Sequence, residues 1–159
     1  MKTVLVVDGY NAINAIPRTR KELKKSLYSA RKAILAICKE FAKTSGYIQD
    51  FCVVFDGETA HRSRDMMEIP HGGTHVFSAT GGGDRKIIDT VKKFSRKGKV
   101  ILASNDNYVR NNARAYGAAL MDARDLLKKK SRKVSVDRKR IKKSLEERIT
   151  RQYGKELGI

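Results

Sequence analysis

Residues 4–11 read Val4-Leu5-Val6-Val7-Asp8-Gly9-Tyr10-Asn11, an apolar run that ends in a polar turn. Every side chain from Val4 to Val7 is apolar, which is typical of a strand that is covered on both faces of a parallel sheet. Asp8 and Gly9 then end the run. We therefore expect residues 3–7 to form a buried strand with Asp8 at its carboxyl end.

Further apolar runs have the same form. Phe51–Phe55 ends at Asp56, and Lys99–Ala103 leads into Ser104-Asn105-Asp106. Two shorter candidates are Thr74–Phe77, which we expect at a sheet edge, and Ala118–Met121. Helical patterns separate these strands, and strands that alternate with helices predict a parallel α/β sandwich.

The helices are indicated by apolar residues that recur every three or four positions. One helical stretch opens at Pro17 and ends at Gly46, where glycine favours a helix stop. A second helix begins at Asp84, a third ends near Tyr116, and a short one covers residues 122–130.

The end of the chain differs from the rest in composition. From Lys128 to Ile159 there are 13 Lys and Arg and 4 Asp and Glu, a net charge of +9. The pattern predicts a final basic helix from Asp137. We expect residues 1–130 to form one domain and residues 131–159 to form a basic helical extension.

The whole chain is strongly basic. Its 159 residues carry 35 Lys and Arg against 17 Asp and Glu, a net charge of +18. This imbalance exceeds what solubility requires and predicts a polyanionic partner, with nucleic acid ahead of an anionic membrane surface. The basic residues that we expect to contact RNA are Arg18, Arg20, Lys21, Arg62, Arg64, Arg85, Arg110, Lys139 and Arg140.

The sequence favours a cytoplasmic protein without a membrane partner. No apolar run approaches the roughly 20 residues that a membrane-spanning helix needs, and the run after Met1 is too short for a signal peptide. Cys38 and Cys52 make neither a disulfide framework nor a paired metal site. A reducing compartment is the simplest expectation.

Acidic residues follow the strands. Asp8, Asp56 and Asp106 each come at or just after the carboxyl end of an expected strand, and Asp84 opens a helix. Ligands of open parallel sheets bind outside these strand ends. Two like charges about 4 Å apart repel by roughly 4 kcal/mol at an effective dielectric near 20. Converging carboxylates would therefore take up protons or hold a hard cation such as Mg²⁺ or Mn²⁺.

Three of these acids also have a simpler interpretation. Asp84 and Asp106 stand where an ordinary helix N-cap would stand, and Asp8 could belong to a turn. In its helix, Asp84 shares the azimuth of Ile88 and Val91, whereas Asp89 lies roughly opposite. We therefore rank Asp84 above Asp89 as a ligand. The glycines at 81–83 have two interpretations. They allow backbone or phosphate to approach Asp84 closely, or they only form a flexible loop.

The opening motif resembles that of the YacP-like NYN domain family, a branch of the PIN-like nuclease superfamily. Further matching segments follow in the same order, and the resemblance covers roughly residues 3–130. These segments are Val53-Val54-Phe55-Asp56, Val76-Phe77 leading to Asp84, Ala103-Ser104-Asn105-Asp106, Gly117-Ala118 and Met121-Asp122-Ala123-Arg124-Asp125-Leu126.

The resemblance implies a PIN-like three-layer sandwich with a mainly parallel central sheet and a C-terminal basic helix. It implies a metal-dependent endoribonuclease that uses Mg²⁺ or Mn²⁺ and leaves 5′-phosphate and 3′-hydroxyl ends. Asp8, Asp84 and Asp106 would be the catalytic metal-binding residues. Asn11 would orient a ligand or water beside them, and Asp56 and Asp89 would be further candidates. The partner would be RNA, including mRNA on the ribosome.

The sequence departs from the family near Asp84. Relatives often carry Gly-Glu-Thr-Ala before this aspartate and an acid four residues after it, whereas this chain has Thr80-Gly81-Gly82-Gly83 and Ile88. A non-catalytic RNA- or ribosome-binding protein on a degenerate nuclease fold is therefore an alternative. A phosphatase of small phosphoesters is a third, which the basic excess disfavours. The sequence leaves the oligomeric state open.

Overall fold

The computed structural model describes residues 1–56, 66–68, 74–78 and 82–128, with the backbone alone for Asp56, 66–68 and 74–78. The chain divides into two units, Met1–Lys129 and Lys130–Ile159, and all described residues belong to the first. The expected basic extension, 131–159, lies outside the described residues. No helix in the described ranges is both long enough and apolar enough to cross a membrane.

A six-stranded sheet forms the centre of the first unit, in the order β3-β4-β2-β1-β5-β6. Its strands are β1 (Lys2–Asp8), β2 (Asp50–Asp56), β3 (Met66–Glu68), β4 (Thr74–Ser78), β5 (Gly98–Ala103) and β6 (Ala119–Met121). All neighbours are parallel except β3 and β4, which are antiparallel. The prediction that residues 74–77 lie at an edge is wrong, because β3 pairs with β4 and takes the edge position.

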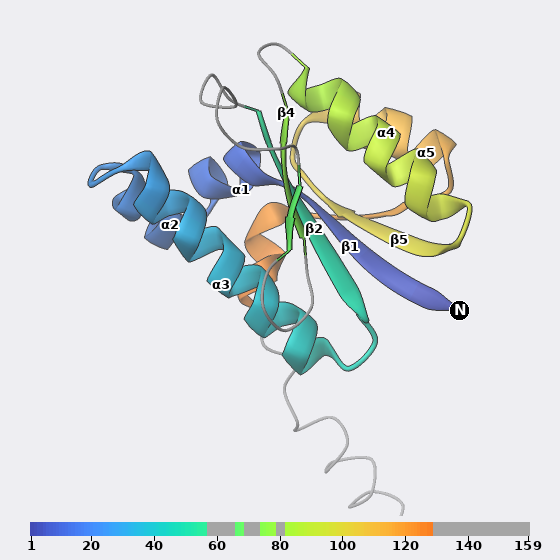
Figure 1. Ribbon diagram of the computed structural model, residues 1–159, viewed down its shortest axis with the longest axis horizontal. Coiled ribbons are helices and arrows are strands. Elements are labelled where there is room, and N and C mark those ends of the chain that lie inside the picture. The colour runs from blue at the N-terminus through green and yellow to red at the C-terminus, as the bar shows by residue number, and fades with distance from the viewer. Residues whose placement is uncertain (57–65, 69–73, 79–81, 129–159) are drawn as a thin grey trace, which may run out of the picture. The chain divides into compact units, whose positions relative to one another are not determined.

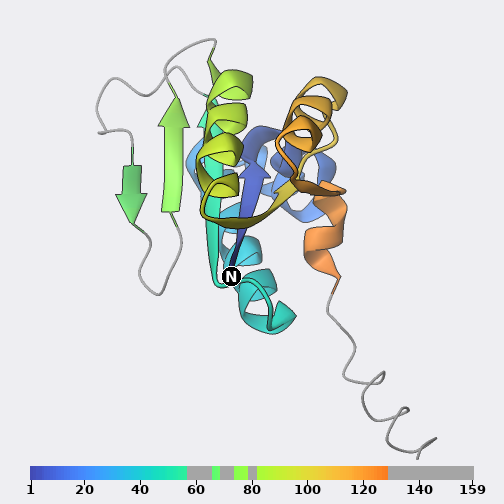
Figure 2. The same cartoon turned by 90° about the vertical axis from the view of Figure 1, so that its right-hand side faces the viewer.

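Helices cover both faces of this sheet (Figures 1 and 2). One layer contains α1 (Gly9–Ala15), α2 (Pro17–Leu23), α3 (Leu27–Ser45) and a short 3₁₀ helix, η1 (Ala123–Leu127). The other contains α4 (Gly83–Ser95) and α5 (Asn107–Ala115). The expected α/β three-layer sandwich with a mainly parallel sheet is confirmed.

Two apolar cores hold the layers together, and β1 contributes to both. Leu5 and Val7 face the core beneath α1 and α3, whereas Val4 and Val6 face the core beneath α4 and α5. Val6 pairs in register with Cys52 on one side and Leu102 on the other. A strand that is buried on both faces cannot alternate polar and apolar residues, which explains its uniformly apolar sequence.

The helical stretch expected from Pro17 to Gly46 is divided in two. Ser26 begins α3, and its hydroxyl oxygen accepts a hydrogen bond from the Ser29 N–H at 2.9 Å. This N-cap satisfies a backbone donor that a continuous helix would have satisfied internally. The predicted stop is correct, because Gly46 adopts the left-handed conformation with φ 72°.

Candidate active site

The sheet reverses its order of strands at β1. From β1 the chain adds β2 on one side, and it later returns to add β5 on the other. In open α/β sheets, the crevice outside the carboxyl ends of such neighbouring strands is the usual place for a ligand. Asp8 is the last residue of β1, and Asp106 follows β5. Topology alone therefore places both carboxylates at this crevice.

A buried hydroxyl connects these two acids. Ser104 is fully buried, and its hydroxyl donates to Oδ2 of Asp8 over 3.0 Å. The hydroxyl oxygen of Ser104 also accepts a hydrogen bond from the backbone N–H of Asp106 at 3.1 Å. Ser104 thus fixes the carboxylate of Asp8 relative to the turn that carries Asp106.

Asp8 is in an unusual electrostatic state. Burial, as the largest cause, raises its pKa from 3.8 to about 6. Hydrogen bonds from Ser104 and from the backbone of Asn11 lower the pKa, while repulsion by the charges of Asp84 and Asp106 raises it again. Carboxylates from three separate parts of the chain therefore interact at this edge of the sheet.

Asp106 has two roles in the geometry. Its Oδ1 accepts a hydrogen bond from the Val109 N–H at 3.1 Å, which makes it the N-cap of α5. It also contributes to the negative potential at Asp8. The N-cap interpretation and the cluster interpretation are therefore compatible, because one carboxylate oxygen is enough for the cap.

Asp84 is exposed and lies in the first turn of α4, whose N-cap is Gly82. The alternative interpretation of Asp84 as an N-cap is therefore wrong. Asp89 is exposed further along α4 and is not among the groups that shift the pKa of Asp8. Asp56 ends β2 at the same edge of the sheet, but its side chain is outside the described part of the structure.

Amide side chains connect the turns around the cluster. Asn11 Oδ1 accepts a hydrogen bond from the Asn105 N–H at 2.8 Å, and Asn105 Oδ1 accepts one from the Ala123 N–H at 3.1 Å. Arg110 Nη1 donates to the carbonyl oxygen of Ser104 at 2.7 Å. Asn11 thus positions the turn that bears Asp106, a role that sequence reasoning missed because it depends on the fold.

Gly9 is required here for packing. A Cβ atom at this position would lie 2.8 Å from the carbonyl oxygen of Val54 and would also meet the ring of Phe55. The start of α1 can therefore approach the end of β2 only with glycine. This close approach brings Tyr10 and Asn11 to the carboxyl edge of the sheet.

The carboxylates have the donor chemistry of a hard-cation site. Among the described residues, no three His, Cys, Asp or Glu side chains are grouped closely enough to hold one metal ion. Mg²⁺, however, is commonly bound through one or two carboxylates while it keeps several waters. Asp8 and Asp106 are the residues that would hold such a partly hydrated ion, and a cation there would offset the repulsion that helps to raise the pKa of Asp8.

The predicted RNA-contacting residues lie in different environments. Arg18, Arg20 and Lys21 are exposed on α2, and Arg85 is exposed beside Asp84. Arg110 is half-buried against the β5–α5 turn. The others, Arg62, Arg64, Lys139 and Arg140, are outside the described residues.

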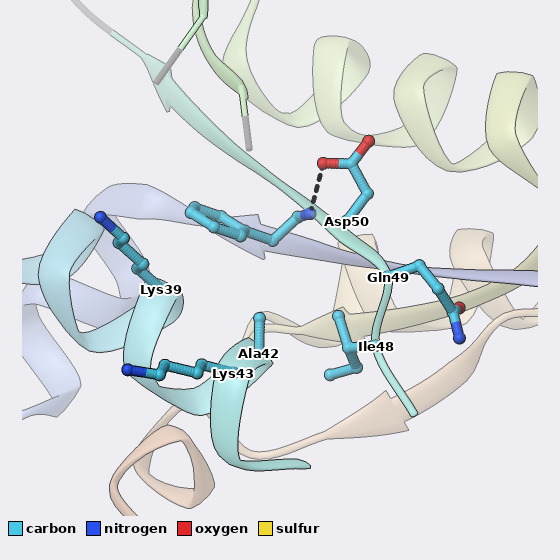
Figure 3. Close-up of a pocket in the computed structure, with 7 residues that line it drawn as sticks. Lys39, Ala42, Lys43, Ile48, Gln49 and Asp50 are labelled. Carbon is cyan, nitrogen blue, oxygen red and sulfur yellow. Dashed lines mark hydrogen bonds between the residues drawn. The ribbon is translucent and has the colours of Figure 1, made fainter. Parts of the chain in front are cut away.

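A pocket of about 520 Å³ lies at the opposite end of the sheet (Figure 3). Lys39 and Lys43 of α3 line it together with Ile48 and Gln49, which lead into β2. Asp50, at the start of β2, is paired with Lys2 at 3.2 Å. The acid cluster belongs to the carboxyl ends of the strands and this pocket to an amino end, so the two are separate.

Comparison with known proteins agrees with the fold. Two crystal structures of Rae1 (YacP) from Bacillus subtilis share the fold at 23% sequence identity. For the first, a mutant, the TM-score is 0.57 and the match covers 94% of this chain and 85% of that chain. For the second, the TM-score is 0.53 with 98% and 86% covered. No curated protein sequence matches the chain.

The family assignment comes from the sequence as a whole. The family model described as the YacP-like NYN domain matches residues 5–157, which is most of the chain. This domain has a nuclease-like, RNA-related fold. The chain therefore belongs to the YacP-like NYN domain family.

Proposed function

We propose that this protein is a metal-dependent endoribonuclease whose site is formed by Asp8, Asp84 and Asp106. The observation that carries the proposal is the Asp8–Ser104–Asp106 arrangement at the reversal of strand order, with hydrogen bonds of 3.0 and 3.1 Å. A fold that only bound RNA would not need to bury a carboxylate beside two others. The cost of gathering like charges is typical of functional sites.

Asp8 and Asp106 would hold Mg²⁺ or Mn²⁺, with Asp84 at the rim of the site. Such an ion, when bound, supplies a Lewis acid for a phosphate oxygen and makes water a better nucleophile. Ser104 keeps Asp8 in place, and Asn11 keeps the turn of Asp106 in place. In the proposed hydrolysis, a water oxygen bonds to phosphorus as the bond to O3′ breaks. The products are then a 5′-phosphate and a 3′-hydroxyl.

RNA is the substrate class that the charge supports. A net charge of +18 attracts a polyanion and raises its local concentration around a site that is itself acidic. An mRNA on the ribosome is one form in which that substrate could be presented. The same charge disfavours small phosphoesters as the main substrate, since they need no extended basic surface.

A non-catalytic RNA-binding protein is the second candidate, and a specific observation favours it. Ile88 stands where relatives often carry an acid, so the chain has one carboxylate fewer for a second metal ion. A protein that had lost hydrolysis would keep its basic surface and its fold.

Cleavage of labelled RNA separates the two functions. We expect internal cuts with 5′-phosphate ends in Mg²⁺ or Mn²⁺ and none in EDTA. Asp8→Asn should lower the rate by at least roughly 10²-fold, the size expected for loss of one group that stabilises charge in the transition state. Asp89→Asn is the matched control, since Asp89 is exposed on the same helix as Asp84 but lies outside the proposed site, and it should cleave normally. RNA that is bound but left intact in every metal would establish the binding protein instead.

A further inference from the structure

The corner between α2 and α3 exposes a large aromatic side chain among lysines. Tyr28, in the first turn of α3, is 74% exposed. Lys24, Lys25 and Lys32 are exposed around it, and Lys25 pairs with Glu22 at 3.0 Å. We call Lys24, Lys25, Tyr28 and Lys32 the α2–α3 corner. Its tyrosine contributes little to the core and is presented to solvent in a positively charged setting.

Tyr28 differs in this respect from Tyr116, one of two exposed tyrosines that the described residues carry on the other layer. Tyr116 is 42% exposed, and the ammonium group of Lys92 lies 5.6 Å from the centre of its ring. A cation over the ring face already satisfies the aromatic quadrupole. The two residues therefore offer a matched pair of surface tyrosines, one on each layer.

Arg31 connects the corner to the interior. It lies three residues after Tyr28, so the two side chains share one face of α3. Its Nε donates to the hydroxyl oxygen of Tyr10 at 3.2 Å, and its Nη2 donates to the same oxygen. The guanidinium carbon also lies 5.7 Å from the ring centres of both Tyr10 and Phe55. Arg31 thus bridges α3 to the carboxyl edge of the sheet.

Tyr10 completes the connection to the acid cluster. It lies two residues after Asp8, and its ring packs against Phe55 with centres 5.5 Å apart. Its oxygen accepts hydrogen bonds from Arg31, and a hydroxyl that accepts can still donate its own proton to another acceptor. A phosphate oxygen beside Asp8 would be such an acceptor, and the adjacent guanidinium would supply positive charge.

We propose that Tyr28, Arg31 and Tyr10 form a track that binds single-stranded RNA and leads it to Asp8. Tyr28 stacks on an unpaired base, the lysines of the α2–α3 corner attract the backbone, and the Arg31–Tyr10 pair binds a phosphate. This proposal rests on the proposed function, because it identifies the form of RNA that the site receives. None of the three residues belongs to the acid cluster.

Single strands fit this track better than duplexes or membranes do. A stacking platform needs an unpaired base with an accessible face, whereas double-stranded RNA is recognised by its shape through 2′-hydroxyl and phosphate contacts. A membrane-binding surface would present several large apolar side chains beside its lysines. Leu27, at 36%, is the one large aliphatic side chain beside Tyr28 that the described residues expose.

The test is RNA binding without cleavage. The protein carries Asp8→Asn throughout and is kept in EDTA, and the probe is a fluorescein-labelled oligouridylate, used alone or annealed to oligoadenylate. Fluorescence anisotropy then gives a Kd for each form. The second changes are Tyr28→Ala, Tyr28→Phe, Arg31→Lys and Tyr10→Phe, with Tyr116→Ala as the matched control.

We expect Tyr28→Ala to weaken single-strand binding by roughly 5- to 100-fold, the range for loss of one stacked base. Tyr28→Phe keeps the ring and should bind normally. Arg31→Lys and Tyr10→Phe should each weaken binding by roughly 2- to 10-fold. Tyr116→Ala should bind as the parent does, and duplex binding should not depend on Tyr28.

Three results would overturn the track. The first is that Tyr28→Ala binds single-stranded RNA as well as the parent does. The second is that Tyr28→Ala loses as much affinity for the duplex as for the single strand. The third is that Tyr28→Ala weakens binding to phosphatidylserine vesicles but not to RNA. Because Tyr28 is exposed, its variants should fold normally, and circular dichroism checks this. The Tyr28 variants therefore test the track even if Arg31→Lys is unstable. If the wild type fails to cleave while Tyr28→Ala loses binding, the hydrolase proposal fails and the track stands. If the wild type cleaves normally while Tyr28→Ala binds single strands as well as the parent does, the hydrolase proposal stands and the track fails.

Discussion

Two turns at the same edge of the sheet each begin with an aspartate, and their electrostatic states are opposite. Asp122 follows β6 and accepts hydrogen bonds from the Arg124 side chain at 3.2 and 3.0 Å, which lower its pKa to about 2. Asp8 ends β1, accepts a hydrogen bond from a neutral hydroxyl and has its pKa raised to about 6 by burial. A strand-end position therefore does not define a site. What distinguishes Asp8 is that its negative charge is incompletely compensated by the protein.

The largest effect should come from removing that charge. The folded protein keeps the Asp8 proton up to about pH 6, whereas the unfolded chain releases it near 3.8. The corresponding stability is present below about pH 4 and is lost as the pH rises through 6. Asp8→Asn avoids this loss and should raise the free energy of unfolding near pH 8 by at most about 3 kcal/mol.

Urea denaturation in EDTA at about pH 8 and about pH 4 measures this difference. The two proteins should be nearly equally stable in acid and should differ at alkaline pH. A wild type that is as stable as Asp8→Asn at both pH values would contradict the raised pKa. We expect Asp8→Asn to be inactive and, at alkaline pH, more stable than the wild type. Replacing a purely structural aspartate would not give this combination.

A smaller effect is expected from the hydroxyl between the acids. Ser104→Ala removes a hydrogen bond that lowers the pKa of Asp8, so the pKa should rise further above 6. Cleavage near pH 7 should fall by roughly 10- to 100-fold, as for other groups that orient a metal ligand. The acid limb of the pH–rate profile should move to higher pH, and Ser104→Thr should restore it.

Ser95→Ala is a matched control for that change. The hydroxyl of Ser95 is buried and has no hydrogen-bond partner within the described residues. Its removal should leave the pH–rate profile in place. A profile that moves equally in both variants would mean that loss of packing, not the bond to Asp8, is responsible.

The smallest effect is expected at the second turn. Asp122 has a lowered pKa, so its pairing with Arg124 stabilises the fold above about pH 4 and is lost as the pH falls toward 2. Because the pair is exposed, solvent screens most of this contribution. Arg124→Ala should make acid unfolding slightly less steep while leaving cleavage unchanged. A loss of cleavage in Arg124→Ala would show that the charges of the Asp122 turn influence the site at Asp8.

Much of the fold could be predicted because the buried strands are uniformly apolar. The expected strands at 3–7, 51–55 and 99–103 each agree with the structure to within one residue at either end. Helix α1 was not predictable in the same way. It is seven residues long and contains glycine and two asparagines, so its stability comes from burying Ala12 and Ile13.

The candidate site was predictable only in part. The positions of Asp8 and Asp106 follow from strand topology, and their proposed roles stay predictions. The contact between Arg31 and Tyr10 joins residues 21 apart in sequence and leaves no periodic signal. The same is true of Ser104, whose importance depends on a partner 96 residues away. Charge and spacing could identify the acids, but not the neutral groups that fix their positions and shift their pKa values.

The hydrogen bonds from Asn11 to Asn105 and from Asn105 to Ala123 have a consequence for measurement. Both backbone amide protons are held by side-chain oxygens, not by the ladders of the sheet or the helices. The Asn105 proton can exchange with solvent deuterium only when the turns after β1 and β5 separate, and the Ala123 proton only when the turns after β5 and β6 separate. Their exchange rates would therefore report how often these three turns come apart, independently of the global unfolding that governs the central strands.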